Sequence, residues 1–552
     1  MIILSKETNI MFEDKIKPLF KVLMSVQSDT NTSREVIIEE VILKWLEAQP
    51  YFAENSHLCG AVPIDQDPHR RQVIWALVKG HGDKTIVLMH HHDAVDIEEY
   101  GHIKHLALEP ELLLEALKDK TLSYQTKIDL ESGEWTFGRG SADMKSGAAI
   151  QLVLASYFSE MKDFNGNILL LSVPDEETLS RGMLHSIPLM TSLRDRYKLD
   201  YVLSINSEPY FNQIKGKALF YQGSVGKIMP ILYVKGVKSH IGDPFNGFNP
   251  SLVLADLQRK TELNVDLCDV HKLEATPPPV WVNLKDRKKT YDASIPEAAT
   301  GYFNWLTFNR STQRIVDKLV SLSKRTLRDT LSHFQDAYEN YCNLTGVIPD
   351  EISFKPEVLT FSQLYDRASR KKPESFQQEY IAYQEKVIDA LNDNQITLPE
   401  ASTRLIEFAI DWIELEGPAI IVAISGPYYP HINNHYIDKK LPFSLEQTIN
   451  EIARSKYDLV FEGQEFFMGI SDMSYASWSG NNDDIEIIKA NSPGWDYIYH
   501  IPFEELATIS MPVVNIGPWG KDLHKITERV LTKDVYERIP YIIKELILKC
   551  LE

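Results

Sequence analysis

The sequence contains little cysteine. Its 552 residues include four cysteines, which lie far apart and form no CxxC pair: Cys59, Cys268, Cys342 and Cys550. This spacing argues against a disulfide framework and against a zinc site built from thiolates. Neither is expected here.

Long apolar runs are also missing. No stretch of about 18 or more apolar residues is present to span a bilayer. The first twenty residues begin apolar but soon become acidic and polar, without the continuous apolar region and cleavage site of a signal peptide. No membrane association is therefore expected, and the expected location is the cytoplasm. No internal repeat or low-complexity tract is evident.

An excess of positive charge is the third absence. Lys and Arg number 58 against 78 Asp and Glu, a formal net charge of −20. This balance argues against nucleic acid as a partner, because contacts with phosphates need clustered cations. Hydrophobic residues make up 43% and charged residues 25%, as in ordinary globular proteins. A chain of this length is expected to form two or more domains.

Short apolar runs alternate with helical patterns in the first part of the chain. Residues 13–45 show apolar positions at the spacing of two amphipathic helices. The runs VIWALV, TIVLM, NILLLSV and YVLSIN suit strands buried on both faces of a mostly parallel sheet. A helical stretch at 147–161 separates two of them. This pattern predicts a three-layer α/β/α domain.

The pattern changes near residue 223. KIMPILYVKGVKSH alternates like a strand, helical stretches follow at 249–261, 311–341 and 373–391, and PAIIVAI is again strand-like. Patterning like that of the first part then resumes. We therefore expect a catalytic domain formed by residues 1–222 and 430–552, interrupted by an inserted α+β domain at 223–429.

Histidines and acids follow the predicted strands, where α/β sheets usually place their sites. In IVLMHHHDAVD, strand alternation puts His91 and Asp93 on one face and His90 and His92 on the other. A histidine cluster of this kind is also common on surfaces. The His-x-Asp spacing favours a metal ligand, because a neighbouring carboxylate can fix the orientation of a ligand imidazole.

Further acids occupy the next two segments. In FGRGSADMKSGAAI, Asp143 precedes a helix expected to begin near Ser146, so it can equally be a helix cap. In LLLSVPDEETLSRG, the adjacent acids Asp175, Glu176 and Glu177 follow a buried strand. Three like charges there are costly unless cations neutralise them, although a solvated loop is the alternative.

Two more residues complete the set. Glu208 follows the strand-like YVLSIN, and His524 is expected in or just before a final helix, where it could also be a surface histidine. Together the segments supply two imidazoles and enough carboxylates for two metal ions that share one carboxylate. Oxygen and imidazole donors without thiolate suit zinc, manganese or cobalt.

The order of these motifs resembles a known family. H-x-D, GRGxxDMK, DEE, EP and a late His are similar to the ArgE/DapE-type metallopeptidases and aminoacylases of clan MH. The overall length, PYYP and GISDMSY resemble the arginine-utilisation (RocB) branch of that group. The resemblance implies a zinc aminopeptidase-like catalytic domain whose insertion is a lid and dimerisation domain.

The resemblance also implies a role for each residue. Asp143 bridges two divalent metal ions, most simply zinc, with cobalt or manganese as alternatives. His91 and Glu208 complete one metal site, and Glu177 and His524 complete the other. Glu176 is the general base for a metal-bridging hydroxide, and Asp93 orients His91.

The inserted segment VKGVKSHIGDPFNGFNP is similar to the lid signature of the family. The resemblance implies that His240 stabilises the oxyanion, often across a homodimer, and that Asn249 supports it or binds substrate. Asp472, in GISD, corresponds to a substrate loop. Two departures stand out: His90 replaces the usual Gly, and the insertion is longer than the usual lid.

These features predict a metal-dependent hydrolase. It would cleave an amide bond of a small N-acyl amino acid or short peptide, in arginine or amino-acid catabolism by analogy with the arginine-utilisation branch. An exopeptidase that cuts unblocked dipeptides would use the same residues, so the two remain open. The other alternative is a non-catalytic regulator or scaffold that keeps the fold, although no expected ligand or base is missing.

Overall fold

The computed structural model describes residues 2–214, 216–349, 354–478, 480 and 482–552, and only the backbone of residues 2–11. The chain divides into two units. Unit 1 comprises Met1–Ser224, Ile432–Ser479 and Pro502–Glu552, and unit 2 comprises Val225–His431 and Gly480–Ile501. Within the described residues, no helix combines the length and apolar character needed to cross a membrane.

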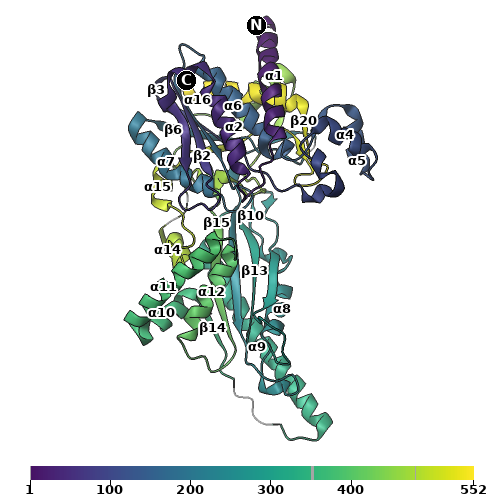
Figure 1. Ribbon diagram of the computed structural model, residues 1–552, viewed down its shortest axis with the longest axis vertical. Coiled ribbons are helices and arrows are strands. Elements are labelled where there is room, and N and C mark those ends of the chain that lie inside the picture. The colour runs from purple at the N-terminus through teal and green to yellow at the C-terminus, as the bar shows by residue number, and fades with distance from the viewer. Residues whose placement is uncertain (1, 215, 350–353, 479, 481) are drawn as a thin grey trace. The chain divides into compact units, whose positions relative to one another are not determined.

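Unit 1 is built on an eight-stranded sheet with the order β1-β2-β5-β3-β6-β18-β7-β17. Figure 1 labels β2, β3 and β6 of this sheet. The pairs β5–β3, β3–β6, β6–β18 and β7–β17 are parallel, and the remaining three pairs are antiparallel. The central strands are buried on both faces because they are nearly continuous runs of Val, Ile and Leu. The strand bounds are β1 Cys59–Pro63, β2 Gln72–Lys79, β3 His81–His91, β5 Asn165–Val173, β6 Asp200–Asn206, β7 Ala218–Tyr221, β17 Phe461–Gln464 and β18 Val513–Asn515.

Helices of unit 1 pack against this sheet. Helix α6 contacts β2, β3 and β5, α16 contacts β3 and α6, and α7 contacts β2 and β5. Almost all of α6 is buried, which its run of Ala, Gly and Leu permits. The helix bounds are α1 Ile2–Ser25, α2 Glu35–Glu47, α3 Pro50–Glu54, α4 Pro110–Lys118, α5 Tyr124–Ser132, α6 Ser146–Ser159, α7 Arg181–Tyr197, α13 Leu445–Tyr457, α15 Phe503–Thr508 and α16 Ile539–Leu551.

A smaller sheet in unit 1 joins distant parts of the chain. Strand β4 (Trp135–Phe137) pairs with β20 (Arg529–Leu531), which also pairs with β19 (Gly520–Lys521). Helix α4 packs beside β4, and their buried side chains share one apolar cluster with the 3-10 segment Glu98–Leu106. This arrangement brings the C-terminal segment that carries His524 next to the segment before Asp143.

Unit 2 contains a five-stranded sheet with the order β12-β13-β9-β15-β14. All pairs are antiparallel except β14–β15. The strand bounds are β9 Gly226–Lys235, β12 Val280–Asp286, β13 Ala298–Thr307, β14 Glu357–Thr360 and β15 Ala419–Tyr429. A separate short pair in unit 2 joins β10 Val270–His271 to β11 Glu274–Ala275, and in unit 1 β8 Gly223–Ser224 pairs with β16 Ile432–Asn433.

Two groups of helices cover the sheet of unit 2. Helix α8 packs on β9, β12 and β13, and α9 packs on α8 and β14. Helices α10, α11 and α12 form a separate apolar core with Ile231 and Tyr233 of β9. The helix bounds are α8 Pro250–Thr261, α9 Thr312–Thr345, α10 Phe361–Lys371, α11 Pro373–Asn392, α12 Leu398–Asp411 and α14 Asn482–Asn491.

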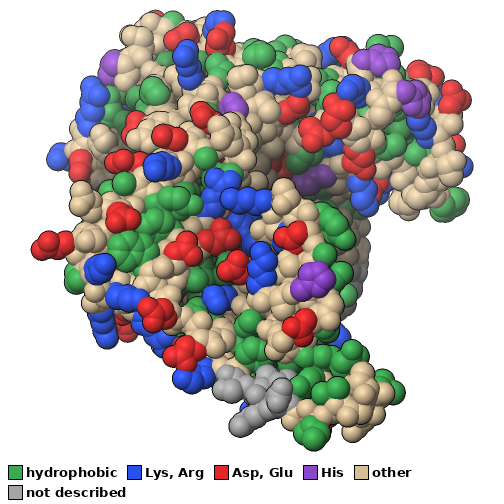
Figure 2. All heavy atoms as spheres, turned by 60° about the horizontal axis from the view of Figure 1, so that its bottom comes forward, with side chains coloured by type: hydrophobic (Ala, Val, Ile, Leu, Met, Phe, Trp, Pro, Cys, Tyr) green, Lys and Arg blue, Asp and Glu red, His purple; other side chains and the backbone are tan. Residues whose placement is uncertain are grey.

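The expected architecture is confirmed: a mixed α/β fold with a large, mostly parallel central sheet and additional helical and sheet regions. One segment differs from the expected division of the chain. Residues 430–552 were expected to belong entirely to the catalytic part, but Gly480–Ile501 groups with unit 2. The physical reason is that α14 packs on α9, α10 and β15. On the face that Figure 2 shows, acidic and basic side chains are intermixed despite the net charge of −20.

Candidate metal centre

Strand β3 ends at the site and delivers His91. His91 is buried, and its Nε2 atom points toward acidic side chains, whereas its neighbours face away from them. His90 Nδ1 lies 3.0 Å from Gln151 Oε1 on α6, and His92 Nδ1 lies 2.9 Å from Ser172 Oγ on β5. Strand alternation therefore separates His91 from the two flanking imidazoles, as expected from the sequence.

Asp143 lies between two imidazoles. Its Oδ1 atom is 3.0 Å from His91 Nε2, and its Oδ2 atom is 3.2 Å from His524 Nε2. Asp143 belongs to the short segment Ser141–Lys145, which runs directly into α6, and its peptide bond to Met144 is cis. One carboxylate is thus shared between two histidines that are 433 residues apart in the chain.

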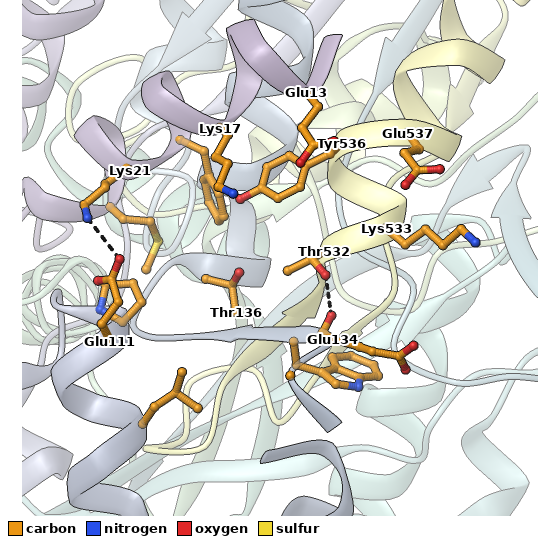
Figure 3. Close-up of a pocket in the computed structure, with 16 residues that line it drawn as sticks. Glu13, Lys17, Lys21, Glu111, Glu134, Thr136, Thr532, Lys533, Tyr536 and Glu537 are labelled. Atoms are coloured by element: carbon orange, nitrogen blue, oxygen red, sulfur yellow. Dashed lines mark hydrogen bonds and ion pairs between the residues drawn. The ribbon is translucent and has the colours of Figure 1, made fainter. Parts of the chain in front are cut away.

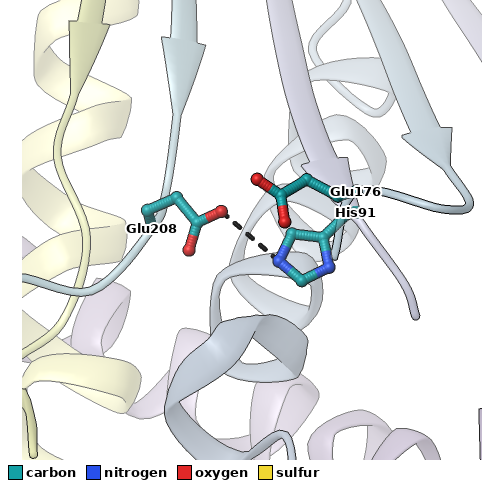
Figure 4. Close-up of side chains that lie close together, drawn as sticks. All are labelled: His91, Glu176 and Glu208. Carbon is teal, nitrogen blue, oxygen red and sulfur yellow. Dashed lines mark ion pairs between the residues drawn. The ribbon is translucent and has the colours of Figure 1, made fainter. Parts of the chain in front are cut away.

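A second carboxylate accompanies each imidazole. Glu208, which follows β6, has Oε1 at 3.3 Å from His91 Nε2. Glu177, which follows β5, has Oε2 at 3.2 Å from His524 Nε2. Figure 4 shows the carboxylates of Glu208 and Glu176 directed toward the His91 ring. The ligand-type atoms fall into two groups, each within 4.8 Å: His91, Glu176 and Glu208, and Asp143, Glu177 and His524.

The spacing of these atoms fits metal coordination. Two ligands at about 2.0–2.1 Å from a tetrahedral ion lie about 3.3 Å from each other. The four distances between imidazole nitrogens and carboxylate oxygens, from 3.0 to 3.3 Å, match this separation closely. The donors are imidazole nitrogens and carboxylate oxygens, a set that binds zinc, cobalt and manganese.

The electrostatics of the group indicate a shortage of positive charge. Burial and the Asp143 carboxylate raise the pKa of Glu208 to about 8 and also raise the pKa of Glu177. Burial raises the pKa of Glu176 well above its usual range, and Glu208 adds to this effect. Glu177 Oε1 is buried without a hydrogen-bond partner in the described part of the chain. Such carboxylates are stabilised by bound cations.

Comparison with known proteins identifies the family. The model of the peptidase family M20/M25/M40 matches residues 87–539. The chain belongs to this family. It is a hydrolase of the metallopeptidase class.

Two relatives of the M20 chain match it over nearly its whole length, and a third matches a part of it. The uncharacterized protein YqjN of Bacillus subtilis (strain 168) is 31% identical over 533 residues, which are 96% of this chain and 95% of that protein. Protein RocB of the same organism is 27% identical and covers 96% of this chain and 94% of that protein. A succinyl-diaminopimelate desuccinylase of Buchnera aphidicola subsp. Baizongia pistaciae is 28% identical over 38% of this chain and 52% of that protein.

Solved structures share the fold of the M20 chain. The M20 family metallo-carboxypeptidase Sso-CP2 of Sulfolobus solfataricus has a TM-score of 0.51 at 12% identity and covers 97% of this chain and 99% of that chain. The di-peptidase Dug1p of Saccharomyces cerevisiae has a TM-score of 0.51 at 10% identity, with 98% and 97% covered. At these identities, the likeness concerns the fold alone.

Asp93 fixes the loop that carries Glu176 and Glu177. Its Oδ1 and Oδ2 atoms accept hydrogen bonds from the backbone N–H groups of Glu176 and Glu177, both over 3.2 Å. Asp93 Oδ1 also lies 3.3 Å from His91 Nδ1. One buried carboxylate therefore positions both the imidazole and the Glu176–Glu177 pair.

A buried ion-pair cluster lies behind this loop and was missed in the sequence. Arg71 Nη1 contacts Asp175 Oδ1 over 2.6 Å and Glu35 Oε1 over 2.8 Å, and Arg71 Nη2 contacts Asp67 Oδ1 over 2.6 Å. All four side chains are inaccessible to solvent. Glu35 Oε2 also accepts a hydrogen bond from the Asp175 backbone N–H. No local sequence pattern joins these residues, apart from the DEE run itself.

A second missed pair links the segments of Asp143 and His524. Arg139 donates to Glu528 Oε2 over 2.7 Å and to the carbonyl oxygen of His524 over 2.8 Å. Glu528 Oε1 accepts from the N–H groups of Ala142 and Asp143. Two features of the sequence could have pointed to this pair: Arg139 in GRG before Asp143, and Glu528 four residues after His524.

The expected position of His524 in or before a helix was wrong. His524 lies in the loop between β19 and β20, with a left-handed φ of 66°, and the final helix begins at Ile539. Contacts with distant residues, chiefly with Arg139, hold this loop. The His524 side chain is half exposed, and its pairing with Asp143 and Glu177 raises its pKa to about 11.

Three further expected residues lie outside the two groups of ligand-type atoms. Asp472 is buried in unit 1 near Ser180, and burial raises its pKa to about 7. His240 and Asn249 belong to unit 2. The exposed His240 ring accepts a hydrogen bond from the Gly242 N–H over 3.0 Å, and Asn249 caps the start of α8. Their functional roles remain predictions.

Proposed function

We propose that the protein uses two divalent metal ions to hydrolyse an amide bond in an N-acyl amino acid or a short peptide. The observation that carries this proposal is the shared carboxylate of Asp143, with one imidazole 3.0 Å from one oxygen and a second imidazole 3.2 Å from the other. Each imidazole has a further carboxylate beside it.

The ligand assignment follows from these contacts. His91 and Glu208 would hold one ion, Glu177 and His524 would hold the other, and Asp143 would bridge them. Zinc suits this donor set, and cobalt or manganese are the alternatives. When bound, such ions lower the pKa of water and polarise the scissile carbonyl.

Glu176 is the proposed general base. Its carboxylate lies beside His91 and Glu208 (Figure 4), and its backbone N–H is held by Asp93. Glu176 would take a proton from the attacking water and deliver it to the leaving amine. Asp93 would orient the His91 ring through Nδ1. Because Glu176 also lies within the group of His91 and Glu208, its test must distinguish a base from a ligand.

Residues 223–429 are proposed to form the lid and dimerisation domain of the enzyme. His240 would stabilise the oxyanion, through a homodimer in which the partner subunit contributes it, and Asn249 would support it or bind substrate. Asp472 would contribute to the substrate site. The proposed setting is the cytoplasm, in arginine or other amino-acid catabolism.

The substrate class rests on analogy with relatives. The desuccinylase relative is named for removing an acyl group, and Dug1p is named as a di-peptidase. Both names describe cleavage of an amide bond next to an amino acid. The proposal therefore covers deacylation of an N-acyl amino acid and cleavage of a short peptide.

Amine release from N-acetyl, N-succinyl and N-carbamoyl amino acids and from dipeptides tests the proposal. The protein is assayed with zinc, cobalt or manganese, and again with a chelator. Chelator-sensitive release from one class of compound is expected and would identify the substrate group. Silence across the panel with metal bound would contradict the proposal and favour a regulatory role.

The variant Glu176→Gln distinguishes a role of Glu176 as general base from a role as metal ligand. The variant is expected to lose turnover by about 10²-fold or more while it retains two metal ions per chain. The exposed Glu505→Gln on α15 is the matched control and should behave like the wild type. Loss of one metal ion from Glu176→Gln would show that Glu176 is a ligand.

A further inference from the structure

Unit 2 contains a cavity of about 470 Å³ that the proposed chemistry does not use. Its walls come from the end of β9, the segment between β12 and β13, and the C-terminal end of α12. A volume of this size is within the usual range for small-molecule sites.

Acidic side chains line part of the cavity, together with the cations of Lys235 and Arg287. Arg287 donates to Glu407 over 2.7 Å and is also paired with Glu400. Glu297 and Asp411 line the same cavity, and neither forms an ion pair in the described part of the chain. Burial raises the pKa of Asp411, and the nearby carboxylates of Glu407 and Glu297 raise it further. These carboxylates are suited to an ammonium or guanidinium group.

Tyr233 supplies a polar group to the same cavity. Its side chain belongs to the apolar core of α10–α12 and is only 6% exposed, yet it lines the cavity. Glu407, Arg287, Asp411 and Glu297 all lie close enough to act on its hydroxyl. A tyrosine hydroxyl that lines a cavity can donate to or accept from a ligand.

Further lysine side chains also line the cavity. Lys288 is occupied, since it lies 2.5 Å from Asp292 Oδ1 and donates to the Ser294 carbonyl oxygen over 3.0 Å. Lys238 and Lys289 line the cavity without forming an ion pair in the part of the chain that the structure describes. These two ammonium groups can therefore donate hydrogen bonds to a carboxylate.

We propose that this cavity binds a small amino acid whose side chain carries a second, cationic group. Its ammonium or guanidinium group would contact Asp411, Glu297 and the Tyr233 hydroxyl, and its carboxylate would contact Lys238 and Lys289. Ornithine, lysine and arginine carry both a carboxylate and a side-chain cationic group.

Ligand binding in the cavity is expected to affect the neighbouring segment. The cavity residue Ile295 donates its backbone N–H to the Ser239 carbonyl oxygen over 2.8 Å, and Ile241 donates to the Ala293 carbonyl oxygen over 3.1 Å. The segment around His240 is thus hydrogen-bonded to one wall of the cavity. Occupancy should slow hydrogen exchange at the Ile241 and Ile295 amides, whether or not His240 takes part in catalysis.

Calorimetric titration of the full-length, metal-loaded protein tests the proposal. The probes are L-ornithine, L-lysine and L-arginine, together with their decarboxylated counterparts putrescine, cadaverine and agmatine. At least one amino acid is expected to bind with one site per chain, at least tenfold more tightly than its amine. Failure of all three amino acids to bind at concentrations up to about 10 mM would overturn the proposal.

Variants locate the binding site. Asp411→Asn and Lys238→Met are each expected to weaken binding by about tenfold or more, and Tyr233→Phe by several-fold. Two exposed residues provide matched controls, Lys386→Met on α11 and Asp393→Asn directly after it, and both variants should bind as the wild type does. If Asp411→Asn and Lys238→Met bind as tightly as these controls, the ligand occupies another site and the proposal fails.

A second cavity provides a further control. It measures about 500 Å³, lies in unit 1 between α1, β4 and α4, and contains a Lys21–Glu111 ion pair of 2.9 Å (Figure 3). In Figure 3 the Lys17 ammonium group points toward Tyr536. Lys17→Met should leave amino-acid binding unchanged. A loss of binding in Lys17→Met equal to that in Lys238→Met would overturn the assignment to unit 2.

Discussion

The guanidinium group of Arg71 contacts the carboxylate of Asp175 over 2.6 Å, where neither side chain is exposed to solvent. Asp175 directly precedes Glu176 and Glu177 and has a left-handed backbone, with φ of 72°. Arg71 therefore holds the loop of the two glutamates from behind, while Asp93 holds it through their backbone N–H groups.

Arg71→Met is expected to be strongly destabilising. It would leave the carboxylates of Glu35, Asp67 and Asp175 buried without their shared cation. Breaking a buried ion pair by removing one partner costs about 3–5 kcal/mol. Denaturant unfolding measures the loss, and Arg367→Met is the control because its pair with Glu357 is exposed and worth less than about 1 kcal/mol. Equal effects of the two changes would refute the expected role of Arg71.

Glu528→Gln should weaken metal binding more than it weakens folding. The amide oxygen can still accept the Ala142 and Asp143 N–H groups, but the charge pair with Arg139 is lost. Because Arg139 also holds the His524 carbonyl group, the position of His524 becomes less defined. Metal affinity is expected to fall by about 10- to 100-fold. Equilibrium dialysis measures it, and unchanged affinity would count against this positioning.

Chelation of bound metal is expected to lower the melting temperature. Glu177, Glu208 and Asp143 would lose the ions that neutralise them. An ion present at about 100 times its dissociation constant stabilises the folded state by about 2.7 kcal/mol. Thermal unfolding before and after thorough dialysis against a chelator measures the difference, and re-addition of metal should reverse it. An unchanged melting temperature would argue against a tightly held pair of ions.

The metal-free protein should lose stability as pH rises. The pKa values of Glu208 and Glu528 are raised to about 8 and about 7, so the folded state keeps these protons after the unfolded chain has released them. The unfolded state then binds fewer protons, and the free energy of unfolding falls between about pH 5 and pH 8. Pairing with Asp143 and Glu177 raises the pKa of His524 to about 11. The free energy of unfolding therefore continues to fall above the pH at which a free histidine loses its proton.

Metal ions should remove much of this dependence on pH. Ions bind the ionised carboxylates, so their uptake is expected to release protons. Calorimetry in buffers of different ionisation enthalpy counts the protons, and urea unfolding at several pH values measures stability. A metal-free protein that becomes more stable between pH 5 and 8 would contradict the prediction.

Local patterns predicted the parts of the site that depend on local structure. The alternation of β3 separated His91 from its flanking histidines, and the position of Asp143 before a helix is confirmed by α6, which begins at Ser146. Gly147, in the first turn of α6, is needed because a Cβ atom there would lie 2.4 Å from the Ser207 carbonyl oxygen. The sequence shows that residue 147 is glycine, but it does not show that the backbone of Ser207 lies so close to it.

Contacts between distant residues could not be predicted. Glu35 and Asp175 lie 140 residues apart, and Arg139 and Glu528 lie 389 apart. Neither pair leaves a periodic signal, so the buried ion pairs and the loop of His524 were missed. Helices α10 and α12 were also missed, although each buries an apolar face in one core of unit 2. A strand run or a helical period reports which face is buried, but it does not identify the partner across that face.

The placement of α14 has a consequence for dissecting the molecule. Unit 2 draws its last helix from Gly480–Ile501, which is separated from the rest of the unit by 432–479. A recombinant fragment ending at residue 431 would lack α14, and the surfaces of α9 and β15 beneath it would become solvent-exposed. An independently soluble version of this unit therefore needs residues 480–501 joined back by a designed linker, rather than a simple truncation.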